Sequence, residues 1–318
     1  MTGISESITD LIGETPLLAL DRITRVLDGR ILAKIEFFNP GYSKKDRAAL
    51  EIILEAEKSG ALAPGQTVVE LTSGNMGTGL AIVCRQSGHP FVAVMSRGNS
   101  IERAKMMRAF GAEVVIVDQA PNSVLGEVSG DDLKLVEERT RQLTKERGAF
   151  RADQFGRRGN MLAHYRHTGP EIWRQSGGAI TAFCDFVGSG GSFAGVSTFL
   201  KEQDREIACY VVEPEGAAAL AGEAVSDPGH PIQGGGYSMS ELALMDGAEI
   251  DGYLTVGGAE ARATARLLAR EEGVFGGFSG GANVAAALKL LRGPQKGATI
   301  AVLICDSGMK YLSTNLWD

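Results

Sequence analysis

The chain turns from a strand into a helix at Asn39-Pro40-Gly41-Tyr42-Ser43-Lys44-Lys45-Asp46-Arg47. The apolar run 31–38 before this stretch alternates well enough to be a strand, and Asn-Pro-Gly ends it. Ser43 is placed to cap a helix that continues through 48–54. Lys45 therefore stands at a strand-to-helix junction, where its amine can point into a cleft and hold a carbonyl cofactor as a Schiff base. The alternative is a lysine in the first turn of an exposed helix.

The composition predicts a globular protein without nucleic-acid or membrane partners. A chain of 318 residues is long enough for two core-bearing lobes, and its net charge of −7 argues against nucleic acid and anionic membranes. Neither a signal peptide nor an apolar run of membrane-spanning length is visible. The four cysteines are scattered without CxxC spacing, which predicts buried thiols in a reducing compartment. We expect a cytoplasmic protein.

Apolar runs separated by helical segments predict parallel sheets that are covered on both faces. The runs expected to be strands are 67–71, 91–95, 112–117, 182–187, 207–212 and 299–304. Helices are expected after most of them, including 100–107, 131–147, 258–272 and 280–292. The stretch 214–250 is rich in glycine, proline and small residues, which favours a loop region lining a cleft.

A glycine loop follows the strand at 182–187 and opens a helix, with the sequence Gly188-Ser189-Gly190-Gly191-Ser192. Converging backbone N–H groups and a helix N-terminus make such a loop a phosphate cradle. A dinucleotide fingerprint would need a third glycine where Phe193 stands, although Glu213 occupies the place of a ribose-binding acid. A small monophosphate fits best.

Two more turns lead from strands into helices. Thr72-Ser73-Gly74-Asn75 offers hydroxyls, an amide and N–H groups that suit a substrate carboxylate, and its alternative reading is an ordinary helix cap. Ser279, in Phe278-Ser279-Gly280-Gly281, can equally be a simple cap. The histidines show no metal-ligand spacing, and no GxSxG nucleophile exists. Pyridoxal 5′-phosphate with an amino acid needs a lysine, a phosphate cradle and a carboxylate site together.

The chain resembles the cysteine synthase/cystathionine β-synthase family of pyridoxal phosphate enzymes over nearly its whole length. The motifs that carry the resemblance are Asp10 to Gly13 with Thr15-Pro16-Leu17, Asn39-Pro40, Ser43 with Lys45-Asp46-Arg47, Thr72 to Asn75, Glu102-Arg103, Phe110 to Glu113, Thr168 to Trp173, Gly188 to Ser192, Asp306-Ser307-Gly308 and Tyr311 to Thr314.

The resemblance implies an α/β fold of type II, like the tryptophan synthase β subunit. Two three-layer α/β/α lobes with mostly parallel sheets would hold the cofactor in the cleft between them. The smaller, partly mobile lobe is expected at 36–155, and the larger, cofactor-binding lobe at 1–35 and 156–318. One catalytic unit of about 8–314 is expected, with no appended regulatory domain, in a homodimer.

The resemblance also implies a role for each site residue. Lys45, rather than Lys44, would be catalytic and would bind the cofactor as a Schiff base. Asn75 would bind the cofactor's 3′-oxygen, Gly188, Ser189, Gly190, Gly191 and Ser192 its phosphate, and Ser279 would face its pyridine nitrogen. The substrate would contact Thr72, Ser73, Gly74, Met76, Gln154 and Tyr42, with the carboxylate held by Thr72, Ser73 and Gln154. No metal is implied.

The implied activity is β-replacement on a β-substituted L-amino acid of the O-acetylserine, O-phosphoserine or serine type. It would pass through an aminoacrylate to which a small nucleophile adds, as in a cysteine synthase, a transferase of amino-acid biosynthesis. The alternatives are a β-elimination lyase or ammonia-lyase on a β-substituted or hydroxy amino acid, and a catalytically quiet relative that binds a partner protein.

Departures from the family pattern cluster at expected substrate contacts. Met76 stands where the family commonly has a hydroxyl, and Tyr42 where a small residue is usual. The stretch 119–126 lacks the usual Gly-Met segment, and 233–239 replaces the glycine-aromatic loop of members that use sulfide. The departures therefore concern the donor and the nucleophile rather than the cofactor.

Overall fold

The computed structural model describes residues 4–121, 123, 128 and 130–318, so much of the stretch 119–126 lies outside the described residues. The chain divides into two compact units. Unit 1 comprises Met1–Ile12 and Asn39–Asn160, and unit 2 comprises Gly13–Phe38 and Met161–Asp318.

Residues before Gly13 belong to unit 1, although the sequence assigned 1–35 to the larger lobe. The physical reason is local packing, because Ile12 packs against the apolar core of unit 1 and Ser7 Oγ lies 3.4 Å from Gln86 Oε1 of the same unit. The roles of the lobes at 36–155 and at 1–35 with 156–318 stay predictions.

Unit 1 is built on a parallel sheet. Among its described residues the sheet has four strands in the order β5-β4-β3-β6. Their bounds are β3 (Val68–Leu71), β4 (Phe91–Ser96), β5 (Glu113–Val117) and β6 (Phe150–Arg151). The helical segments of the unit are η1 (Ile8–Leu11), α2 (Lys45–Lys58), α3 (Asn75–Ser87), α4 (Ile101–Ala109) and α5 (Gly130–Glu146).

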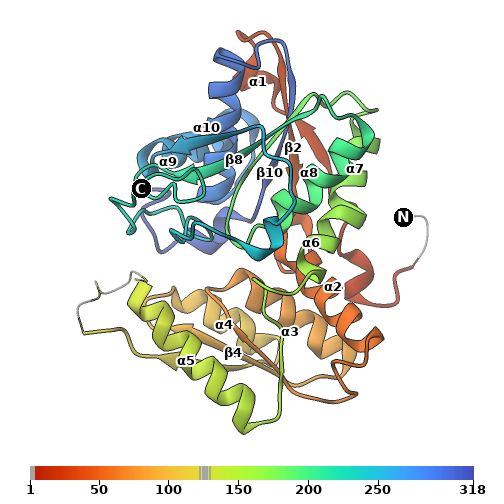
Figure 1. Ribbon diagram of the computed structural model, residues 1–318, viewed down its shortest axis with the longest axis vertical. Helices are drawn as coiled ribbons and strands as arrows, with labels where there is room; N and C mark the ends of the chain where they lie inside the picture. Colours follow the sequence, from red (N-terminus) through yellow and green to blue (C-terminus); the bar gives the residue numbers. More distant parts are fainter. Residues whose placement is uncertain (1–3, 122, 124–127, 129) are drawn as a thin grey trace. The chain divides into compact units, whose positions relative to one another are not determined.

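Alternation along the strands of unit 1 creates two apolar layers. Val68 points into the core shared with α2 and α3, whereas Val69 points into the core shared with α5. The helix α5 therefore covers one face of the sheet, and α2, α3 and α4 cover the other, as Figure 1 shows.

Unit 2 contains a larger, mostly parallel sheet. In the part of the unit that the structure describes, it has six strands in the order β1-β2-β10-β7-β8-β9, and the pair β1-β2 is antiparallel. The strands are β1 (Leu17–Ala19), β2 (Arg30–Ile35), β7 (Ala182–Phe186), β8 (Ala208–Pro214), β9 (Gly252–Val256) and β10 (Thr299–Ile304). The two sheets confirm the expected α/β class.

Helices cover both faces of the sheet in unit 2. Cys184 and Phe186 point into a core with α9 and α10, whereas Phe183, the neighbour of Cys184 in the strand, stacks on Phe193 of α8, with ring centroids 6.1 Å apart. The helical segments are α1 (Asp21–Thr24), η2 (Glu36–Phe38), α6 (Gly159–Ala163), the π-turn η3 (His164–Thr168), α7 (Gly169–Gln175), α8 (Gly191–Gln203), η4 (Ala243–Met245), α9 (Gly258–Leu267), the π-turn η5 (Leu268–Glu272), α10 (Phe278–Arg292) and η6 (Gly308–Tyr311).

The strand expected over 31–38 is shorter than predicted. It ends at Ile35, and Glu36–Phe38 form a 3-10 turn. The buried Glu36 carboxylate accepts a hydrogen bond from Thr15 Oγ1 at 2.8 Å, so its side chain is satisfied by a side chain of the neighbouring segment. No helix among the described residues is long and apolar enough to cross a membrane.

Candidate active site

The lysine-bearing stretch begins with a tight turn in unit 1. Tyr42 N donates to Asn39 O at 2.8 Å, and Tyr42 itself has a φ of 62°, in the left-handed region. The Gly41 N–H donates to the buried Asp46 carboxylate. These contacts place Tyr42 with 51% of its surface exposed.

Lys45 is the first residue of α2, and its side chain is half-buried. Its backbone N–H donates to Ser43 Oγ at 3.3 Å, so Ser43 contacts the helix start, although the N-cap residue is Lys44 rather than the predicted Ser43. Lys44 precedes the helix and is 9% exposed. The assignment of the catalytic amine to Lys45 stays a prediction.

The segment Thr72–Asn75 connects the end of β3 to the start of α3. Thr72 Oγ1 accepts hydrogen bonds from the N–H groups of Gly74 and Gly77, each at 2.9 Å. Gly74 has a φ of 139°, which glycine adopts without strain. The buried Arg103 donates from Nη1 to Ser73 O at 2.7 Å. The backbone of the expected carboxylate loop is thus held by the Thr72 hydroxyl and by the Arg103 guanidinium.

Asn75 and Met76 open α3 but lie in different surroundings. Asn75 is half-buried, whereas Met76 is 2% exposed and belongs to the apolar core of unit 1. The thioether therefore serves the core in this structure, and the contact between Met76 and a substrate stays a prediction.

Close packing of α2 and α3 brings Lys45 and Asn75 to the same end of unit 1. A Cβ added at Gly79 would lie 3.1 Å from Lys45 O and 3.1 Å from Cβ of Ala49, so the two helices touch at this glycine. Lys45 and Asn75 each begin one of these helices. The helix N-termini supply positive potential at that end.

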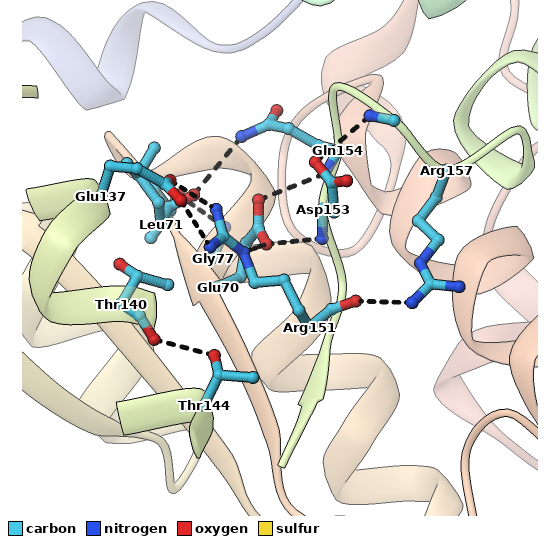
Figure 2. Close-up of polar contacts among 12 residues, drawn as sticks. Glu70, Leu71, Gly77, Glu137, Thr140, Thr144, Arg151, Asp153, Gln154 and Arg157 are labelled. Atoms are coloured by element: carbon cyan, nitrogen blue, oxygen red, sulfur yellow. Dashed lines mark hydrogen bonds and ion pairs between the residues drawn. The ribbon is translucent and has the colours of Figure 1, made fainter. Parts of the chain in front are cut away.

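Gln154 lies at the same edge of the sheet as Thr72. The strands β3 and β6 are parallel neighbours, with Val68 opposite Phe150, so the residues that follow them meet at their carboxyl ends. Gln154 is 9% exposed, and its Nε2 donates to Leu71 O at 3.5 Å (Figure 2). Unit 1 therefore gathers the expected carboxylate-binding residues at one edge.

The glycine loop expected to bind phosphate connects β7 to α8 in unit 2. Gly190 has a φ of 85°, and a Cβ at Gly188 would lie 2.5 Å from Gly234 O, so both positions require glycine. Ser189 is buried. Ser192 Oγ donates to the buried Asp185 carboxylate at 2.5 Å, so this hydroxyl hydrogen is directed into the protein. The role of Ser192 as a phosphate donor stays a prediction.

Ser279 is the second residue of α10 and is 6% exposed. One turn further on, Asn283 Oδ1 accepts from Phe186 N at 2.5 Å, and its Nδ2 donates to Asp185 Oδ1 at 3.1 Å. This contact ties the start of α10 to β7, the strand that leads into the glycine loop. Unit 2 thus joins the two segments that the sequence assigned to the cofactor.

The comparisons with known proteins agree in their classification. The family profile described as "Pyridoxal-phosphate dependent enzyme" matches residues 8–306. The chain belongs to this family. Cysteine synthase 3 of Caenorhabditis elegans is 40% identical over 310 residues, which are 97% of this chain and 88% of that protein. O-Ureido-L-serine synthase of Streptomyces lavendulae is 38% identical over 313 residues, 98% of this chain and 92% of that protein.

A solved structure shares the fold. O-Acetylserine sulfhydrylase isoform 3 of Entamoeba histolytica matches with a TM-score of 0.90 at 33% identity, over 99% of this chain and 92% of that one. The protein is therefore a pyridoxal-phosphate-dependent enzyme with the fold of the type II family, as the sequence predicted.

The residues of each unit fit this cofactor. The Gly188–Ser192 loop leads into the 13-residue helix α8, and the left-handed Gly190 at its N-cap lets the loop backbone turn so that N–H groups can face a phosphate. In unit 1 Lys45 supplies an amine at a helix start. We find no group of three or more His, Cys, Asp or Glu side chains fit for a metal ion in the residues that the structure describes.

Three buried charged residues near the site were not assigned a role from the sequence. They are Glu70 before the Thr72–Asn75 loop, Arg103 beneath that loop, and Asp185 before the glycine loop. Arg103 lay in a motif of the resemblance, but Glu70 and Asp185 lie inside the apolar runs 67–71 and 182–187, where the sequence assigned them no role. Only the tertiary contacts reveal what these side chains hold.

Proposed function

We propose that the protein catalyses β-replacement on a β-substituted L-amino acid of the O-acetylserine, O-phosphoserine or serine type, as a transferase of the cysteine synthase kind. The observation that carries this proposal is the carboxylate-friendly edge of unit 1. There the Thr72–Asn75 loop and Gln154 follow neighbouring parallel strands, in the same unit as Lys45. The names of the similar proteins, cysteine synthase and O-ureido-L-serine synthase, support it.

The proposed roles follow from the chemistry of each side chain. Pyridoxal phosphate, when bound, draws electron density away from the α-carbon of an amino acid. Thr72, Ser73 and Gln154 would bind the substrate carboxylate through hydroxyl, amide and N–H donors. Lys45 would hold the cofactor and, once freed, take the proton from the α-carbon with Nζ.

The remaining roles concern the cofactor and the specificity of the site. Gly188–Ser192 would receive the phosphate, Asn75 the 3′-oxygen, and Ser279 the pyridine nitrogen. Gly74 and Tyr42 would border the substrate. A serine hydroxyl does not enforce a protonated pyridine as an aspartate would, and this favours expulsion of a β-substituent over transamination.

We test this proposal with the purified protein and three donors: O-acetylserine, O-phosphoserine and L-serine, each with and without sulfide. We expect a sulfur-containing amino acid to form only when sulfide is present. Pyruvate and ammonia as the main products under both conditions would instead favour the β-elimination lyase. Binding of the cofactor without turnover of any donor would favour the catalytically quiet relative.

The lysine assignment has its own test. Lys45→Ala should lower turnover at least 100-fold, because the group that holds the cofactor and moves the proton is lost. Lys44→Ala is the matched control and should retain the visible absorption of the cofactor. Retention of that absorption together with full turnover in Lys45→Ala would contradict the assignment.

We also propose a cellular compartment and an oligomeric state for the enzyme. We place it in the cytoplasm, because all four cysteines are buried thiols that form no disulfide, which suits a reducing compartment. We also propose a homodimer, in line with the resemblance to the family. Sedimentation of the cofactor-loaded protein at micromolar concentration tests the homodimer, for which the measured mass should be twice that of one chain.

A further inference from the structure

A fully buried carboxylate lies beside the carboxyl end of β3. Glu70 is 0% exposed, and its oxygens accept hydrogen bonds from two consecutive backbone N–H groups. Asp153 N lies 2.7 Å from Oε2, and Gln154 N lies 3.3 Å from Oε1. Arg151 adds a charged contact from Nε at 3.0 Å. Figure 2 shows these donors converging on one side chain.

The turn that Glu70 holds is strained. Asp153 has a φ of 42°, in the left-handed region that residues other than glycine seldom adopt. Such a backbone persists only where its surroundings hold it. Here the N–H groups of Asp153 and Gln154 are fixed by Glu70, and Gln154 O accepts from Asn160 Nδ2 at 2.7 Å.

The turn determines where the Gln154 amide lies. Gln154 Nε2 donates to Leu71 O, the residue directly before Thr72. The amide is thus aimed at the end of β3, beside the loop expected to bind the substrate carboxylate. A change in the 153–154 backbone would rotate this amide away from Thr72.

A carboxylate meets the requirements of this position in a way that a neutral side chain does not. Its two oxygens accept from all three donors, whereas an amide has one oxygen and adds two donors of its own. Burial raises the pKa of Glu70, and the Arg151 charge and the hydrogen bonds oppose that shift. Arg151 in turn contacts Glu137 of α5 at 2.8 Å, so the cluster reaches across a face of the sheet.

We propose that Glu70 is a positioning residue, which fixes the Asp153–Gln154 turn so that the Gln154 amide can bind the carboxylate of the amino-acid substrate. The inference rests on the proposed function for the identity of the ligand. It predicts a loss that is specific for the carboxylate group rather than a general loss of the folded protein.

The test uses the cofactor-loaded protein and two substitutions. Glu70→Gln keeps the volume and removes the charge, and Glu70→Asp keeps the charge and shortens the side chain. Glu113→Gln is the matched control, because Glu113 forms a 2.6 Å pair with Arg147 in the same unit but on an exposed surface of β5. Each protein is titrated with L-serine and with L-serine methyl ester, and the visible absorption of the cofactor reports binding.

We expect Glu70→Gln to weaken binding of L-serine about tenfold and to leave binding of the methyl ester within about twofold of the parent. Glu113→Gln should match the parent with both ligands. Hydrogen exchange at the Asp153 and Gln154 amides should accelerate in Glu70→Gln and stay unchanged in the control. Gln154→Ala should abolish the effect of Glu70→Gln on L-serine, because the two changes act on one contact.

Equal weakening for the acid and the ester, or unchanged binding of L-serine, would overturn the inference. If Glu70→Gln does not fold, Glu70→Asp decides the matter by the same two titrations. A parent protein that binds L-serine but forms no replacement product would refute the proposed function, while the comparison of acid with ester still decides the role of Glu70.

Discussion

Gly74 and Arg103 fit against each other in a way that a larger residue at position 74 would prevent. Gly74 has a φ of 139°, and a Cβ there would lie 2.4 Å from Cδ of Arg103. The arginine cannot retreat easily, because it is 3% exposed and donates to Ser73 O. One glycine thus lets a buried cation lie directly beneath the expected carboxylate loop.

Gly74→Ala should lower the free energy of unfolding by about 2 kcal/mol and weaken amino-acid binding, because both the backbone and Arg103 must shift. Gly88→Ala is the control, since Gly88 ends the same helix with a φ of 78° and an added Cβ there meets nothing within 4 Å. Urea unfolding measures both proteins. A loss at Gly74 no larger than the loss at Gly88 would contradict a cost from the contact with Arg103.

The helix α3 depends on Thr72 for its start. The residue at its N-cap is a glycine, and Thr72 Oγ1 accepts from the N–H groups of Gly74 and Gly77. Both N–H groups lie at the start of α3, where the backbone N–H groups of a helix have no carbonyl acceptor within the helix. Since the Thr72 hydroxyl hydrogen is not needed for these two contacts, it remains available to donate.

Thr72→Val should cost about 2 kcal/mol of stability, because two buried N–H groups lose their acceptor. It should also raise KM for the amino acid more than it lowers kcat. Thr72→Ser keeps the oxygen and should lose less than about 1 kcal/mol. Guanidinium unfolding and steady-state kinetics provide the measurements, and a serine variant as weak as the valine one would contradict the capping role.

Elements with a strong local signal were predicted well, and those without one were not. The apolar run 299–304 coincides with β10, and Ser43 does contact the start of α2. The two-residue strand β6 was missed because it is too short for a periodic pattern, and β9 because it follows a glycine-rich stretch. Glu36–Phe38 continue an apolar alternation in sequence, yet the chain turns there.

Some residues of the candidate site could likewise be recognised from the sequence, and others could not. Lysine, glycine and serine residues at strand-to-helix turns could be recognised from sequence, since their chemistry is visible locally. Glu70 could not, because its partners lie more than eighty positions away in Arg151, Asp153 and Gln154. Met76 was assigned to the substrate from its place in the loop, and that contact stays a prediction, while the structure shows the side chain in the apolar core of unit 1.

Across the whole molecule, the cysteines behave as core residues. All four are buried, and burial raises the pKa of Cys209 to about 12 and those of Cys84 and Cys184 further above the usual thiol value. The thiolates of Cys84, Cys184 and Cys209 are therefore scarce in the folded protein. In the unfolded chain the same thiols ionise at an ordinary pKa of about 8.5.

Stability should fall as the pH rises above about 8.5, because the unfolded chain then loses protons that the folded protein keeps. Each of the three thiols contributes up to about 1.4 kcal/mol per pH unit in that range. Urea unfolding at pH 8 and pH 10 measures the slope. Cys84→Ala should reduce the slope by roughly a third, and an unchanged slope would exclude the thiols as its cause.

The pairing of β2 with β10 also governs the order in which the molecule can be completed during synthesis. Arg30 lies opposite Thr299 in the sheet of unit 2. The strand β2 is therefore synthesised long before β10, the strand with which it pairs. The strands of unit 1 all lie within 68–151, and the ribosome can release them as a finished sheet much sooner. Until β10 emerges, the edge of β2 that pairs with it carries unpaired backbone N–H and C=O groups, at which a nascent chain is exposed to wrong pairings.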